Sequence, residues 1–179
     1  MTLPHIPDPL PGDAVAADAL PIVIIPRVRD IGAFEVRRAL PSAQRQMVGP
    51  FIFFDQFGPI TMQVGQGQDV RPHPHIGLST VTWLFDGVMY HRDSLGSEQQ
   101  IAPGELNWMT AGKGIVHSGR TPADERARPH QIFGIQSWVA LPKQHEETRP
   151  AFEHVAMADL PLLSDHGRKV RVVAGSMYG

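Results

Sequence analysis

The strand pattern is clearest in residues 78–118, which read LSTVTWLFDGVMYHRDSLGSEQQIAPGELNWMTAGKGIVHS. Short apolar or alternating runs lie at 78–85, 87–92, 105–109 and 114–118, separated by Asp86-Gly87, Leu95-Gly96, Pro103-Gly104 and Ala111-Gly112. Alternation with a period of two is typical of strands with one buried face, and Gly or Pro between such runs is typical of tight turns. The stretch therefore predicts an antiparallel β-sandwich or barrel.

The same pattern extends to both sides of this stretch. It predicts strands at 22–29, 33–40, 51–57, 131–141 and Lys169–Ala174, with turns at Gly49-Pro50 and Gly58-Pro59. Glycine and proline, 17 of each among 179 residues, favour short strands over long helices. Only 156–164 suggests a helix, and Pro161 limits it to one turn. Five prolines before Ile22 predict an extended or disordered arm over residues 1–21.

The charge balance argues against several kinds of partner. A formal net charge of −2 and a pI near 6.5 give no electrostatic basis for direct binding to nucleic acid or to an anionic membrane. The small basic cluster is interrupted by acidic residues, which favours a solvated loop: Arg120, Asp124, Glu125, Arg126 and Arg128. The apolar run 22–25 is too short to span a bilayer, so we predict a cytoplasmic protein without a membrane partner.

Histidines are the candidate metal ligands. The chain has no Cys, so any metal must be held by His, carboxylates and water. Side chains two residues apart on a strand point to the same face, so His73 and His75 would present both imidazoles to one point. His117 follows 42 residues later, beyond several predicted strands, and an antiparallel barrel can return it to the pair. Three neutral imidazoles suit Fe, Zn, Cu or Ni, although an isolated His-x-His can equally be a pair without a ligand.

The remaining candidates point to structural roles. His130 and His154 have no partner at metal-ligand spacing, and His91 is expected on a hairpin arm before the turn at 93–96. The other three lie in the arm, in a charged stretch and in a loop: His5, His145 and His166. No serine has the Gly-x-Ser-x-Gly setting of a hydrolase nucleophile. Trp83, Trp108 and Trp138 lie in predicted strands, where core packing is the default for a large ring. A ligand pocket lined by Phe53 or Trp108 is the functional alternative.

Four blocks of sequence, spread over residues 49–142, together resemble the signatures of the pirin family. They are GPFIFFDQFGP at 49–59, HPHIG at 73–77, PGELNWMTAGKGIVHS at 103–118 and GIQSWVALP at 134–142, in the order that the family shows. The resemblance implies a protein with two cupin domains. This chain would supply the N-terminal one, an antiparallel double-stranded β-helix or jelly-roll barrel over 22–168. Residues 169–179 would begin the connection to a second barrel that is absent, which leaves the chain a fragment or a naturally short relative.

The resemblance also implies a site and an activity. Members hold one metal, usually iron, on three His and one Glu. For this chain we therefore expect Fe, with Ni, Zn, Cu and Mn as the alternatives. The His ligands carry over to His73, His75 and His117, but the Glu position falls on Gly119. Some members open flavonols as quercetin 2,3-dioxygenases, and the animal protein regulates transcription. The readings that stay open are therefore a dioxygenase acting on a small aromatic substrate, a metal-dependent regulatory module without turnover, and a degenerate cupin without metal. A surface left bare by the missing barrel would favour a homo-oligomer.

Overall fold

The computed structural model describes residues 22–32 and 34–176, and in them strands paired antiparallel make up the fold. The prediction of an all-β antiparallel protein is confirmed for these residues. The expected arm at 1–21 lies outside them. Helical structure among them is confined to α2 (Ala123–Arg126) and the 3-10 turns η1 (Lys143–His145) and η2 (Met157–Asp159). None of the helices in this part of the chain has the length or hydrophobicity needed to cross a membrane.

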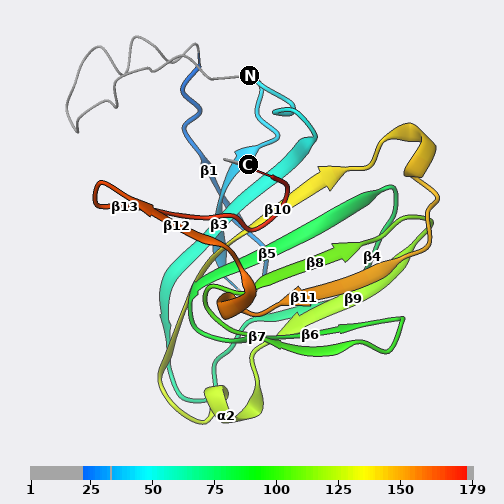
Figure 1. The fold of residues 1–179 in the computed structure, drawn as a ribbon. Coiled ribbons are helices and arrows are strands. Elements are labelled where there is room, and N and C mark those ends of the chain that lie inside the picture. Colours follow the sequence, from blue (N-terminus) through cyan, green and yellow to red (C-terminus); the bar gives the residue numbers. More distant parts are fainter. Residues whose placement is uncertain (1–21, 33, 177–179) are drawn as a thin grey trace.

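The larger sheet has seven strands and runs through the middle of the molecule (Figure 1). Its strands, in spatial order, are β1 (Arg27–Asp30), β2 (Glu35–Leu40), β3 (Phe51–Met62), β10 (His130–Ala140), β5 (Leu78–Asp86), β8 (Leu106–Thr110) and β11 (Ala151–Val155). The long strand β10 lies between β3 and β5, so segments far apart in sequence meet at the centre of the sheet.

The smaller sheet has four strands: β4 (Asp69–His75), β9 (Ile115–Arg120), β6 (Met89–Asp93) and β7 (Glu98–Ile101). The two sheets face each other across a core. One apolar cluster between them contains Phe57, Leu84, Met89 and Ile132, and a second contains Met109 and Ile115. Alternate residues of β3 are buried at 53, 55 and 57, as expected for a strand with one face on the core.

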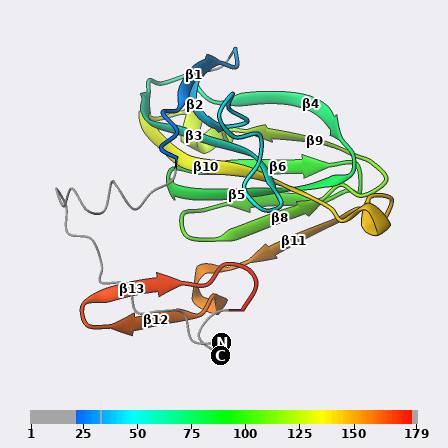
Figure 2. The same ribbon diagram turned by 90° about the horizontal axis from the view of Figure 1, so that it is seen from above.

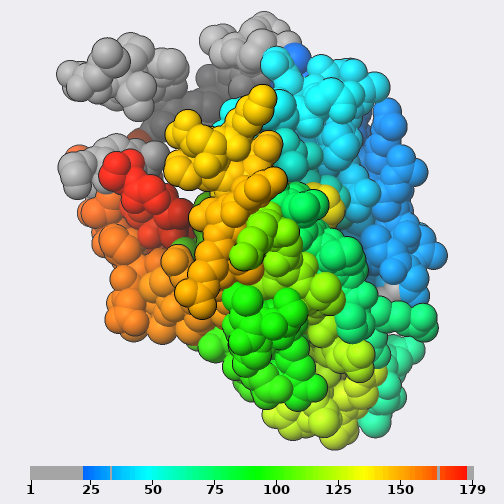
Figure 3. Space-filling model, turned by 90° about the vertical axis from the view of Figure 1, so that its right-hand side faces the viewer, coloured from blue at the N-terminus to red at the C-terminus, as the bar shows by residue number. Residues whose placement is uncertain are grey.

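A hairpin of β12 (Leu162–Asp165) and β13 (Arg168–Arg171) stands apart from both sheets (Figure 2). The hairpin and the first described strands lie on opposite sides of the molecule, and the segment that follows β10 runs between them (Figure 3). Arg171 ties the hairpin to the chain before it by donating to the carbonyl oxygens of Met157 and Leu160. The barrel boundary at 168 and the connection over 169–179 stay predictions.

Three local predictions are wrong. The turn expected at Gly58-Pro59 lies inside β3, because Gly58 adopts a positive φ and the strand bulges against Ile132 there. A side chain at Gly58 would meet the Ile132 carbonyl oxygen, so only glycine permits this approach. The basic cluster is not simply a solvated loop, because it includes the end of β9 and the helix α2, in which Glu125 is buried. The pattern also misses β7, β11 and β12, which are only four or five residues long.

Candidate metal centre

Three histidines meet on the face of the smaller sheet that points toward the larger one. His73 and His75 leave β4 on one face, and the antiparallel pairing of β4 with β9 sets His117 directly opposite His73. Their ring centroids are 4.5 to 5.1 Å apart. Each ring offers one nitrogen such that the three nitrogens lie within 4.8 Å of one another. The structure thus brings together the three histidines that the sequence singles out.

The environment keeps two of these rings neutral. Burial, followed by repulsion from His73, lowers the pKa of His75 to about 4. Burial, followed by repulsion from the neighbouring histidines, lowers the pKa of His117 to about 3, although Asp93 acts in the opposite direction. At neutral pH both imidazoles therefore carry a free lone pair, which is the form that binds a metal.

The hydrogen bonding of the cluster fits a divalent metal. Both ring nitrogens of His117 are buried and lack a hydrogen-bond partner among the described residues, which is costly unless something else satisfies them. His73 Nδ1 lies 2.8 Å from the Arg71 carbonyl oxygen. Nδ1 is then the donor, so Nε2 holds the lone pair, an arrangement typical of metal-bound histidine. The residues present can hold the ion that the sequence implies.

A cavity of about 260 Å³ opens beside the three histidines, between the two sheets. Phe53 and Trp138 from neighbouring strands stack in its wall, with ring centroids 4.0 Å apart and planes inclined by 11°. Trp138 also meets the His75 ring in an edge-type contact, with ring centroids 4.9 Å apart and planes inclined by 75°. The aromatic pair therefore links the metal cluster to the apolar wall, which is where a planar ligand would lie.

An ion pair lines the same cavity. Arg38 donates two parallel hydrogen bonds of 2.8 Å to the buried Asp55 carboxylate, and its guanidinium lies 4.4 Å from the centre of the Phe53 ring. The hydrogen bond to Asp55 raises the pKa of Arg38 above its already high value, against the effect of burial. An ion pair is thus held beside the aromatic wall. Its two residues are 17 positions apart, so no local pattern in the sequence indicates the pair.

His91 is a buried neighbour of the cluster, which its place in the sequence does not reveal. It lies on β6 before the turn, as predicted, but its ring is buried in the cavity wall, 5.4 Å from His117. His91 Nε2 bonds Asp93 Oδ2 at 3.0 Å. Burial would raise the pKa of Asp93, but hydrogen bonds from His91, Ser97 and Leu95 outweigh it and lower that pKa. The signal available in the sequence is a His-x-Asp on the strand that pairs with His117.

Gly119 lines the cavity, where the structure pairs it with His91 across β6 and β9. Its φ lies outside the left-handed range, and a Cβ there would contact only Met89, whose Sδ lies 3.1 Å away. This position could therefore carry a side chain at the expense of a small shift of Met89. Among the residues that line this cavity, only Asp55 carries a carboxylate, and it does not belong to the metal cluster.

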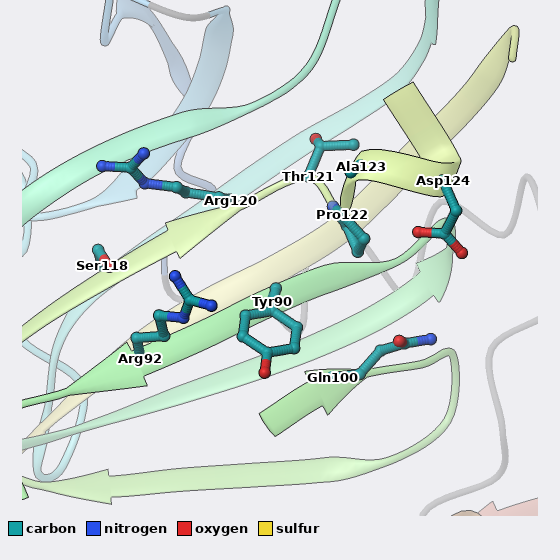
Figure 4. A pocket seen from close by; sticks show the side chains of 9 residues that line it. All are labelled: Tyr90, Arg92, Gln100, Ser118, Arg120, Thr121, Pro122, Ala123 and Asp124. Atoms are coloured by element: carbon teal, nitrogen blue, oxygen red, sulfur yellow. The ribbon is translucent and has the colours of Figure 1, made fainter. Parts of the chain in front are cut away.

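Trp108 does not line this cavity. It lies on the opposite face of the larger sheet, in a second hollow shared with Phe54, Trp83 and Phe85. A third hollow lies on the outer face of the smaller sheet, where Arg92 and Arg120 extend near Tyr90 (Figure 4). His154 bonds Asn107 instead of joining the cluster. Phe53 and Trp108, both expected as pocket residues, thus belong to different surfaces.

The fold is a cupin-type β-barrel, and its three clustered histidines could hold a metal ion. The comparisons with known proteins assign the family. The model of the family described as Pirin matches residues 33–139. A pirin-like protein of Caulobacter vibrioides is 50% identical, over 88% of this chain and 56% of the relative. Rat pirin is 33% identical, over 83% of this chain and 48% of the relative.

Solved structures agree with this assignment. The crystal structure of a quercetin 2,3-dioxygenase from Acinetobacter baumannii superposes with a TM-score of 0.79 and 42% identity, covering 86% of this chain and 50% of that one. The chain therefore belongs to the pirin family. It spans about half the length of the curated relatives that it matches.

Proposed function

We propose that this chain holds a divalent non-haem metal on His73, His75 and His117 and serves as the metal-binding domain of a quercetin 2,3-dioxygenase-type enzyme, which opens a flavonol with O₂. The observation that carries the proposal is the cluster itself. Its three ring nitrogens lie within 4.8 Å of one another, and both nitrogens of His117 are buried without a partner among the described residues. Similarity to a quercetin 2,3-dioxygenase over 86% of the chain supports the type of reaction.

Each part of the site has a chemical task in this proposal. A metal in such a site supplies a Lewis acid and redox centre at which O₂ and a flavonol hydroxyl can react. The stacked pair of Phe53 and Trp138 would hold the planar ring system and keep water from it. Arg38 would attract negative charge that develops on the flavonol oxygens. A cavity of about 260 Å³ suits a small aromatic molecule, since drug-sized ligands commonly occupy about 300–1,000 Å³.

We propose iron as the resident metal. Neutral imidazole ligands with open positions suit Fe(II), and they also accept Ni, Zn and Cu, so supply in the cell contributes to the choice. Mn is the less fitting alternative because it prefers oxygen ligands. Elemental analysis of protein purified without chelators measures this directly. We expect close to one Fe per chain, and a preparation with another metal at full occupancy would correct the identity of the ion.

The experiment that tests the proposal is oxygen uptake with quercetin, measured on iron-loaded protein. His117→Ala should abolish both iron binding and uptake, because it removes a ligand from the centre of the cluster. His154→Ala is the matched control, since His154 is bonded to Asn107 away from the cavity. Loss of uptake in both variants, or in neither, contradicts the proposed site.

One observation favours a second function, a metal-dependent regulatory module without turnover. The site has Gly119 where a carboxylate would serve as the base for the flavonol hydroxyl, and loss of a positioned base commonly lowers a rate by about 10²–10⁴. Full iron occupancy without oxygen uptake would support this alternative. Absence of any bound metal would favour a degenerate site.

A further inference from the structure

On the neighbouring strand β6, a His–Asp pair lies in register with Gly119 and His117. β6 and β9 are antiparallel, with His91 opposite Gly119 and Asp93 opposite His117. Gly119 follows His117 by two residues, so both face the cavity, and His91 lines that cavity as well. Gly119 is in register with the apolar Val70 on β4 and with His91 on β6. The polar group in register with the missing carboxylate is therefore an imidazole backed by a carboxylate.

The orientation of His91 is fixed from two sides. Phe152 stacks on its ring at 4.2 Å with planes inclined by 11°. Asp93, whose side chain is fully buried, accepts from His91 Nε2 at 3.0 Å and also from the backbone N–H groups of Leu95 and Ser97. Because Nε2–H is committed to Asp93, the acceptor lone pair of the ring lies on Nδ1. No hydrogen bond to His91 Nδ1 is formed by the residues that the structure describes.

The distances decide how His91 can act. Its ring is 5.4 Å from His117, little more than the 4.5 to 5.1 Å that separate the three clustered rings. Its nitrogens nevertheless do not join the cluster, whose members lie within 4.8 Å of one another. His91 is thus too far away to be a ligand itself, but close enough to bond a water molecule that is one. A carboxylate–imidazole pair at this range acts on a metal through a water ligand.

We propose that His91, oriented by Asp93, is a positioning residue that takes the place of the carboxylate missing at Gly119, by accepting a hydrogen bond from a water or hydroxyl ligand on the open side of the ion. This inference rests on the proposed metal site. It adds to the three histidine ligands a fourth residue, which contacts the ion through a bound water or hydroxyl. The negative charge of Asp93, which lies behind His91, would partly offset the positive charge of the ion. The site of this chain is therefore a three-His centre completed by His91 and Asp93.

Co(II) binding tests the inference without recourse to turnover, because the visible absorption of Co(II) reports its ligands. His91→Phe keeps the stack on Phe152 and removes the acceptor. We expect it to weaken Co(II) binding by about tenfold or more, the usual effect of losing such an outer contact, and to change the spectrum. His91→Gln restores an acceptor and a donor to Asp93, so it should recover part of the affinity. Asp93→Asn should change the spectrum while keeping all three ligands.

Two controls make the outcome decisive. His154→Phe removes a half-buried histidine outside the cavity and should leave Co(II) affinity and spectrum unchanged. Gly119→Glu should raise the Co(II) affinity by a larger factor in the His91→Phe variant than in the wild type. The reason is that a glutamate at 119 and His91 would fill the same role at the ion. The inference is overturned if His91→Phe, His91→Gln and Asp93→Asn all match the wild type while His73→Ala abolishes binding. If His73→Ala also binds Co(II) normally, the proposed metal site itself fails.

Discussion

Replacing Gly119 by glutamate introduces the carboxylate that the family carries two residues after its last histidine ligand. The backbone at Gly119 does not require glycine, because its φ is outside the left-handed range, and the new Cβ meets only Met89. Displacing the Met89 side chain is an overpacking change that typically costs about 1–3 kcal/mol. That penalty falls on the metal-free and metal-bound protein alike. The comparison of metal affinities therefore reports the new ligand.

The expected gain follows from one added anionic ligand. We expect Gly119→Glu to bind Fe(II) or Ni(II) at least tenfold more tightly than the wild type, equivalent to about 1.4 kcal/mol. At equal metal excess this adds about 3–6 °C to the metal-induced rise in Tm, from about 2–4 °C per kcal/mol for a chain of this size. Oxygen uptake with quercetin should increase as well, because the carboxylate also provides a base.

Calorimetric titration and thermal unfolding with and without metal measure both quantities. Gly119→Gln is the matched variant, since it has the same shape without the charge and should gain little. The reasoning is refuted if glutamate and glutamine bind the metal equally, or if the wild type already equals a His₃Glu relative in affinity and rate. Either result would mean that the carboxylate is dispensable or supplied from elsewhere.

Three further predictions follow from the structure. In the metal-free protein, the folded pKa values of about 4 for His75 and about 3 for His117 lie below the ordinary 6.5, so the unfolded chain binds more protons once the pH falls below 6.5. These two histidines should therefore lower the free energy of unfolding as the pH falls from 6.5 to about 3, and should not change it above pH 6.5. Urea titrations at several pH values measure this free energy. A flat profile below pH 6.5 would contradict the burial of the two rings. Trp138→Ala should raise the KM for quercetin while leaving metal content unchanged, since Trp138 adds no ligand atom to the cluster and meets the His75 ring only in an edge-type contact. A loss of metal would instead make Trp138 part of the metal site. Phe85, 50% exposed beside an aromatic hollow on the outer face of the larger sheet, should support concentration-dependent self-association that Phe85→Lys abolishes in analytical ultracentrifugation; a monomer at all concentrations would refute this.

Much of the fold can be predicted from the sequence, because turns and strands are indicated by residues that are close together in the chain. Dipeptides such as Asp86-Gly87 and Ala111-Gly112 mark real strand ends, and period-two alternation marks the strands between them. The exceptions have physical reasons. Gly58-Pro59 looks like a turn, yet the partner strand β10 continues past it and holds β3 in one piece. Strands as short as β7 and β12 depend on pairing with a neighbour, and their own residues give almost no signal.

The candidate site, too, is partly predicted by the sequence and partly decided by the tertiary structure. His73 and His75 form a same-face pair by strand geometry alone, and the resemblance to the pirin family names His117 as their partner. Only the tertiary structure decides what surrounds them, because antiparallel pairing joins residues that the chain keeps apart. It places His91 opposite Gly119, sets Arg38 against Asp55, and separates Phe53 from Trp108 onto opposite faces of one sheet. The sequence by itself determined the types of candidate ligand and the period-two pattern of the strands. The register between distant strands decided which side chains share the cavity, because a shift of one residue would turn the side chains of a strand to its other face.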